Sequence, residues 1–163
     1  MKNIIIAILL FTNLLLAFDA NDLKQIKDNE DCIMCDFSYA DLSGLDLSML
    51  DLSESDFSHA NLSNTIAHKT NFSNANLTNT IFKESNLKGA KFKKAILKNT
   101  NFYEAKAWKV DFTNAYIDKC NFNESALGSA IFKNNNLTNS TFKGAILYKT
   151  YFKKSVIGRP QER

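Results

Sequence analysis

The residues best suited to chemistry are two cysteines three positions apart, Cys32 and Cys35. A CxxC pair can form a disulfide, bind a metal or exchange electrons with another thiol. A thioredoxin-like role needs an α/β context, haem attachment needs a histidine where Asp36 stands, and zinc needs two further ligands nearby. The surrounding sequence supplies none of these, so we interpret the pair as a disulfide or as two plain thiols.

The remaining reactive side chains do not form a catalytic set. The only histidines, His59 and His68, fall at outward positions of the pattern described below, and Cys120 falls at an inward one, as a buried and inert thiol. No nucleophile, base and orienting group recur together, and no long loop is available to carry them. We therefore predict no catalytic residue, no metal site, no cofactor and no enzymatic activity.

The first residues have the features of a secretory leader. Lys2 is followed by an apolar run over residues 4–16, and Ala17 and Ala20 are alternative small residues for cleavage. The run is shorter than the roughly 18–20 apolar residues that a retained membrane anchor needs. We predict a signal peptide over residues 1–17 and export to the periplasm or medium of a bacterium, with no transmembrane span after its removal.

From Cys35 to Arg159 the sequence divides into 25 consecutive pentads without a slip. The middle residue is Phe in eleven pentads, Leu in ten, and Ile or Ala in the other four. The first residue is Ala, Ser, Thr, Cys or Val in 22 of the 25. A period of five fits neither a helix nor a flat strand, but it fits a chain that turns a corner every five residues.

These pentads closely resemble the A(D/N)LXX motif of the pentapeptide-repeat family. The resemblance covers about three quarters of the chain and implies an all-β fold, a right-handed quadrilateral β-helix with four pentads in each coil. We assign residues 18–34 to an N-terminal cap segment, 35–159 to the β-helix and 160–163 to a C-terminal tail. Such coils bury their inward residues only by stacking on one another.

A coil of four pentads predicts that residues twenty positions apart stack in columns. Phenylalanines then fill two opposite faces of the core, at a spacing close to that of strands in a sheet. One column is Phe72, Phe92, Phe112, Phe132 and Phe152, and the other is Phe82, Phe102, Phe122 and Phe142. Asn135 falls at an inward first position, where we expect its amide to bind the backbone.

The two ends of the rod differ. We expect a short helical plug over residues 21–31, capped by Asn21 or Asp22, with Leu23 and Ile26 on its inner face. No equivalent plug follows the last pentad. The C-terminal pentads instead place apolar residues at outward positions, which indicates either a homodimer contact at this end or ordinary scattered apolar surface residues. These residues are Ile131, Ile146, Tyr151 and Val156.

Charge is divided along the chain. Residues 18–57 carry a net charge of −9 and residues 58–163 a net charge of +11. Family members that protect DNA gyrase resemble duplex DNA through an acidic surface, whereas most of this chain is basic. We therefore predict an exported scaffold that binds an unknown protein or an anionic envelope component, with no specific nucleic acid, and keep a gyrase protector as the alternative.

Overall fold

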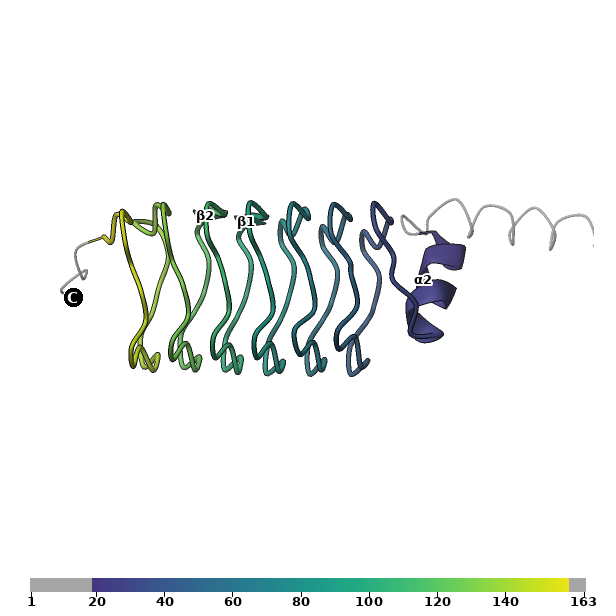
Figure 1. Ribbon diagram of the computed structural model, residues 1–163, viewed down its shortest axis with the longest axis horizontal. Helices are drawn as coiled ribbons and strands as arrows, with labels where there is room; N and C mark the ends of the chain where they lie inside the picture. Colours follow the sequence, from purple (N-terminus) through teal and green to yellow (C-terminus); the bar gives the residue numbers. More distant parts are fainter. Residues whose placement is uncertain (1–18, 159–163) are drawn as a thin grey trace, which may run out of the picture.

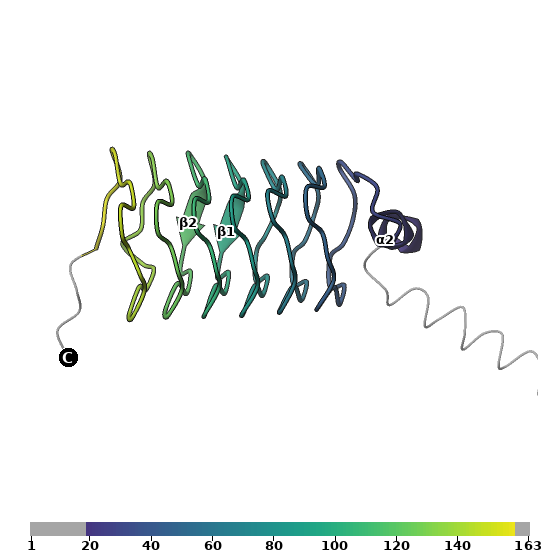
Figure 2. The ribbon, with the colours of Figure 1, turned by 60° about the horizontal axis from the view of Figure 1, so that its bottom comes forward.

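The computed structural model describes residues 19–158, which form a rod of stacked coils with one helix at its end (Figure 1). The helix, α2, spans Ala20–Lys27. The coils follow one another along the long axis in chain order, and the turned view shows the same succession (Figure 2). Within the described residues, no helix has the length and apolar character needed to cross a membrane.

The register of the coils confirms the four-pentad turn. Parallel bridges join residues twenty positions apart on four successive faces, beginning with Asp36 to Asp56, Asp41 to Asn61, Asp46 to Ile66 and Asp51 to Asn71. Two segments are regular enough to count as strands, β1 (Ile96–Lys98) and β2 (Tyr116–Asp118), and they pair in parallel in the same register. The right-handed sense of the coil stays a prediction.

Each coil is bonded to the coils on both sides. The second residue of a pentad donates its N–H to the preceding coil, as Asn71 does to the Leu50 carbonyl (2.9 Å). The middle residue donates to the following coil, as Phe72 does to the Lys91 carbonyl (2.8 Å). Because these bonds run between coils, a single coil leaves most of its backbone groups without partners, and only the stack satisfies them.

The corners are tight turns that need a left-handed residue. In the turn that begins at Phe72, the N–H of Ala75 donates back to the Phe72 carbonyl (3.2 Å), and Asn74 between them has φ +60°. Glycine, asparagine and charged residues alike adopt this conformation at the fifth position of the pentads. The left-handed region costs a residue with a Cβ roughly 1–2 kcal/mol, so the stack must overcome this strain at nearly every corner.

The phenylalanine columns form the centre of the rod. Neighbouring rings within the Phe72 column lie 4.8–5.4 Å apart and within the Phe82 column 4.9–5.3 Å apart, with nearly parallel planes. The two columns also meet edge to face across the coil, as Phe92 and Phe102 do at 5.8 Å. The ring contacts of the two columns are therefore either stacked or T-shaped.

The first position of each pentad is inward and close to the backbone of the preceding coil. Where it carries a hydroxyl, that group often donates to a carbonyl 23 residues earlier, as Thr80 does to Phe57 and Thr100 to Leu77. In other pentads the hydroxyl donates to a carbonyl three residues earlier, as in Thr65, Ser85 and Ser125. Asn135 uses the same position, and its Nδ2 donates to the carbonyls of Phe112 and Ala115 (both 2.9 Å). Polar residues are thus tolerated in this core because each one binds a carbonyl.

The start of the rod differs from the sequence prediction. The coil already includes residues 30–34, because Cys32 and Met34 donate their N–H groups to the Asp51 and Ser53 carbonyls of the following coil. Met34 also has the left-handed φ of a corner, +59°. The helix therefore ends at Lys27 rather than extending to residue 31.

The helix cap is also different from the prediction. Asp19 is the N-cap of α2, and its carboxylate accepts from the N–H of Asn21 (2.7 Å). The carboxylate of Asp22 is instead bound to the first coil. Ile26 is buried and Leu23 is partly buried against the core, so the inner face of the plug is as expected.

Several predictions fall on residues outside the described part of the chain. They are the signal peptide over residues 1–17, the start of the cap segment at Phe18, the last repeat residue, Arg159, and the tail over residues 160–163.

Replacing a central ring should cost much more stability than replacing a terminal one. Phe102 is fully buried between Phe82 and Phe122, so Phe102→Ala should lower the free energy of unfolding by about 3–5 kcal/mol. Phe152 is only partly buried, and Phe152→Ala should cost clearly less. Urea unfolding followed by far-UV circular dichroism measures both, and equal losses would contradict this account of the core.

Relieving one strained corner should stabilise the rod. Glu54 is exposed and has φ +63°, so Glu54→Gly removes the Cβ clash at the cost of a more flexible unfolded chain. We expect a gain of about 0.5–1 kcal/mol. Glu54→Ala is the matched control, because it removes the same charge but keeps the strain. A thermal melt in which the two variants behave alike would show that the gain does not come from the corner.

Candidate functional site

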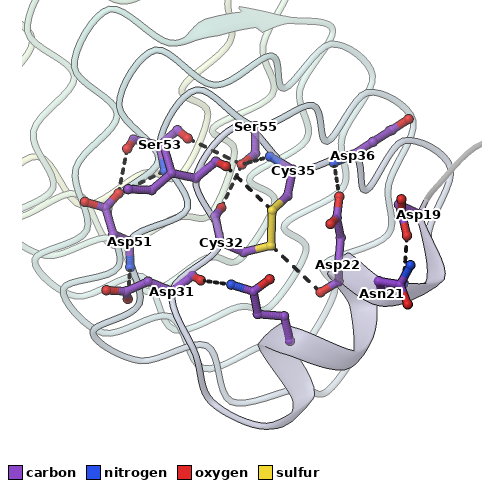
Figure 3. Close-up of a disulfide and its surroundings, with 12 residues drawn as sticks. Asp19, Asn21, Asp22, Asp31, Cys32, Cys35, Asp36, Asp51, Ser53 and Ser55 are labelled. Carbon is purple, nitrogen blue, oxygen red and sulfur yellow. Dashed lines mark hydrogen bonds between the residues drawn. A yellow bond between two sulfur atoms is a disulfide. The ribbon is translucent and has the colours of Figure 1, made fainter.

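Cys32 and Cys35 meet at the first corner of the rod, under α2 (Figure 3). Their sulfurs form a disulfide, with the Cα atoms 5.7 Å apart. Cys32 occupies a middle position and Cys35 the next first position, so both side chains point inward. The Ser55 hydroxyl donates to the Cys32 carbonyl and accepts from the Cys35 N–H, both at 3.0 Å, which ties the bridge to the following coil.

Carboxylates near this corner replace carbonyls that a preceding coil would supply. The Asp22 carboxylate of α2 accepts from the N–H of Asp36 (2.7 Å), and the Asp31 carboxylate accepts from the N–H of Asp51 (2.7 Å). Gln25 of the helix also donates to the Asp31 carbonyl. The plug therefore satisfies part of the exposed edge of the β-helix, which would otherwise invite pairing with another chain.

The same corner holds three groups of metal-ligand type, Asp22, Cys32 and Cys35. Their ligand atoms lie within 4.8 Å of one another, but both sulfurs are used by the disulfide. The third cysteine, Cys120, is buried at a first position, and burial raises the pKa of its thiol to about 11. At neutral pH this thiol is protonated, which makes it a poor nucleophile.

Aspartates occupy the outward second positions of successive pentads in the first coils, where they have a structural role. Asp41 and Asp46 accept from the N–H groups of Ser43 (3.1 Å) and Ser48 (2.9 Å) two residues later. Hydrogen bonds from the side chain and backbone of Ser43 hold the pKa of Asp41 below its ordinary value, and Ser48 does the same for Asp46. Asn61 continues the same arrangement in the next coil.

At the other end of the rod, middle residues lose their cover. Leu147 and Ile157 are 40% and 55% exposed, whereas the middle residues of the preceding coils are buried. Of the four outward apolar residues, Ile146, Tyr151 and Val156 are exposed and Ile131 is half-buried. The end of the described chain therefore presents an apolar surface.

Between residues 65 and 158, charge is divided by face as well as along the chain. We call two adjacent faces the basic side: one is made by residues 65–69, 85–89, 105–109, 125–129 and 145–149, and the other by the pentads that directly follow these. Register places eleven exposed lysines and a single acid, Asp111, on this side, a net charge of +10. The lysines are Lys69, Lys88, Lys91, Lys93, Lys94, Lys106, Lys109, Lys133, Lys149, Lys153 and Lys154.

The two opposite faces are neutral over the same residues. They carry four lysines and four acids. The acids are Glu84, Glu104, Asp118 and Glu124. The sequence alone already aligns lysines in columns, such as Lys69, Lys109 and Lys149, and the register of the bridges shows that the lysine-rich faces are adjacent.

Comparison with known proteins gives the family. Residues 35–74 match the family described as pentapeptide repeats (8 copies), and residues 86–160 match that described as a pentapeptide repeat region. The chain belongs to the pentapeptide-repeat proteins. Proteins of this family are in general structural or binding proteins rather than enzymes.

Solved structures of other pentapeptide-repeat proteins resemble the chain. Rfr23 from the cyanobacterium Cyanothece 51142 is 22% identical, with a TM-score of 0.38, and the match covers 83% of this chain and 97% of Rfr23. HetL from Nostoc sp. strain PCC 7120, a protein involved in heterocyst differentiation regulation, is 18% identical, with a TM-score of 0.29 and coverages of 82% and 92%.

Full-length QnrB1, a plasmid-mediated fluoroquinolone resistance protein, is 17% identical, with a TM-score of 0.35 and coverages of 79% and 82%. The search against curated proteins returned no match.

Reducing the disulfide should loosen the N-terminal end of the rod. The bridge closes a ring of four residues, Cys32 to Cys35, and the chain-entropy relation gives a loss of about 2 kcal/mol when such a ring is opened. We expect a reductant to speed hydrogen exchange at the amides of Asp36 and Asp51. Exchange at the amide of Asn101, in the middle of the rod, should not change. Unchanged exchange at the first two amides would show that the disulfide does not hold the plug.

Acid should weaken the first coils through their aspartates. The pKa values of Asp41 and Asp46 are lowered in the folded state, so their stabilising effect is complete above about pH 3.9 and is lost as the pH falls further. The double variant Asp41→Asn, Asp46→Asn keeps the turn acceptors but cannot titrate. On acidification, the thermal unfolding midpoint of this variant should fall less than that of the unmodified protein. An equal fall in the two proteins would contradict the stabilising role of these carboxyls.

Proposed function

We propose that this protein is a non-enzymatic binding scaffold, exported from the cell, that presents the faces and ends of its β-helix to a protein or an anionic surface. The segregation of charge carries this proposal. Eleven lysines on one side of a rigid rod, against a neutral opposite side, create a positive field that attracts anionic partners. The inward positions of each pentad are required for the packing of the coil. Only the outward side chains are therefore free to recognise a partner.

Export is proposed from the leader pattern of residues 1–17 and is supported by the disulfide. Disulfides such as that between Cys32 and Cys35 persist in oxidising compartments and are rare where thiols are kept reduced.

The apolar C-terminal end is proposed as a contact with a second copy of the chain. Its exposed residues Ile146, Tyr151 and Val156 belong to three consecutive pentads of the last coil and so lie on three successive faces of the rod. A twofold end-to-end contact covers this last coil. Analytical ultracentrifugation of the purified protein tests this contact. A dimer that Ile146→Lys converts to a monomer supports it, and a monomer at all concentrations overturns it.

The second candidate is a topoisomerase protector that mimics duplex DNA. The observation in its favour is that the outward second positions of the first pentads are all acidic: Asp36, Asp41, Asp46, Asp51 and Asp56. Against it, these aspartates cover only the first coils, and the longer part of the rod is basic.

Fractionation of the native host, with N-terminal sequencing of the recovered protein, separates the two candidates. A mature chain that begins at Phe18 or Asn21 in the periplasm or medium is the expected result. An uncut chain in the cytoplasm overturns the proposal. A gyrase supercoiling assay then tests the protector directly.

A further inference from the structure

We propose that the basic side binds an extended, linear, acidic polysaccharide that lies along the rod axis. This inference rests on the proposed binding role, because it names one class of partner for one side of the rod. Three observations support it: the charge of this side, the position of the single tryptophan, and the spacing at which lysines and aromatic rings recur.

The positive charge of the basic side favours an anionic ligand. The face formed by residues 65–69, 85–89, 105–109, 125–129 and 145–149 contains five lysines and no acid. On the adjacent face, Asp111 is partly neutralised by Lys93, whose Nζ lies 3.2 Å from its carboxylate. An anionic polymer along this side therefore meets lysines at successive coils with almost no opposing charge.

Trp108 supplies a stacking surface on the same face. Its ring lies over Gly128 of the following coil, where a Cβ added to the glycine would come within 1.9 Å of the ring. Glycine at this position thus allows the ring to lie along the face instead of projecting from it. Trp108 remains 37% exposed, so part of its ring is accessible to a ligand that stacks on it.

The spacing of these groups indicates a polymer with a repeating unit. Lys69, Lys109 and Lys149 share one corner column, separated by Gly89 and Ser129, so a lysine recurs at every second coil.

Aromatic rings recur with the same period beside these lysines. Trp108 and Tyr148 are also two coils apart, with Gly128 between them, and the Lys149 Nζ lies 5.1 Å from the centre of the Tyr148 ring. Two coils correspond to about 10 Å at the spacing of strands in a sheet.

A repeat of this length suits an extended glycan better than the other polyanions. A disaccharide unit in an extended β-linked chain is of similar length, so one acidic group and one apolar sugar face per disaccharide meet one lysine and one ring. Duplex DNA carries a phosphate at about every 3.4 Å of each strand, which is far denser. A membrane-binding surface requires side chains that project into the lipid, whereas the Trp108 ring lies flat along the rod.

The test uses the fluorescence of the purified protein. Trp108 is the single tryptophan of the chain, so its emission reports on stacking at this site alone. The probe is hyaluronan, which carries one carboxylate per disaccharide, and neutral chitin oligosaccharides are the uncharged comparison. We expect hyaluronan to change the emission, with an affinity that falls as salt is raised, and chitin oligosaccharides to bind more weakly.

Three variants and one control locate the site. Trp108→Ala should weaken hyaluronan binding on the order of tenfold, as loss of a stacking ring does in other polymer sites; calorimetry replaces fluorescence for this variant. Lys109→Gln should also weaken binding, whereas Lys83→Gln on the neutral side is the matched charge control and should not. Gly128→Ala should weaken binding without any change of charge, because it displaces the ring.

The remaining outcomes decide against the proposal. Equal effects of Lys109→Gln and Lys83→Gln would show nonspecific attraction, and a stronger response to poly(dT) or to phosphatidylglycerol vesicles would assign the basic side to nucleic acid or to lipid. If hyaluronan causes no response, the polysaccharide inference is overturned, but the proposed scaffold role is not. The scaffold role itself is decided separately, by whether the immobilised protein retains a specific partner from an envelope extract.

Discussion

The structure depends on hydrogen bonds that run between coils rather than within them. Asn71 donates to the coil before it and Phe72 to the coil after it, and the same pair of bonds recurs on every face. A coil that stood alone would expose these groups and the inward side chains together. Each coil is therefore stable only as part of a stack, which explains why the pattern runs through 25 pentads without an insertion.

Because the coils must stack, inward and outward positions of the pentad are under different constraints. Inward residues must fill a fixed space, and the phenylalanine columns, with rings 4.8–5.4 Å apart, show how narrow that requirement is. Outward residues have no such requirement, except that aspartate or asparagine at the second position completes the corner. The surface can thus carry a net charge of −9 at one end and a basic side elsewhere without any change in the core.

The parts of the fold that repeat could be predicted from the sequence, and the parts that break the repeat could not. The Phe72 and Phe82 columns follow directly from the period. The pentad at residues 30–34 was missed because its middle residue is Cys32 rather than Leu or Phe, and only its backbone bonds to Asp51 and Ser53 identify it. The position of Trp108 over Gly128 was missed for a similar reason, because side-chain direction depends on the neighbouring coil and not on the pentad itself.

The two ends of the rod solve the problem of an unpaired edge in different ways. At the N-terminal end, carboxylates of Asp22 and Asp31 stand where backbone carbonyls of another coil would be, and the disulfide holds this arrangement under α2. At the other described end, core residues such as Leu147 and Ile157 are exposed. An edge covered by polar side chains disfavours pairing, whereas an apolar end favours it. Association through the C-terminal end would cover the last coil of the basic side, because Ile146 and Tyr151 lie on it beside Lys149. The earlier coils of the basic side, including Trp108, would stay free, so contact with a second copy and contact with an anionic polymer there are compatible in one assembly.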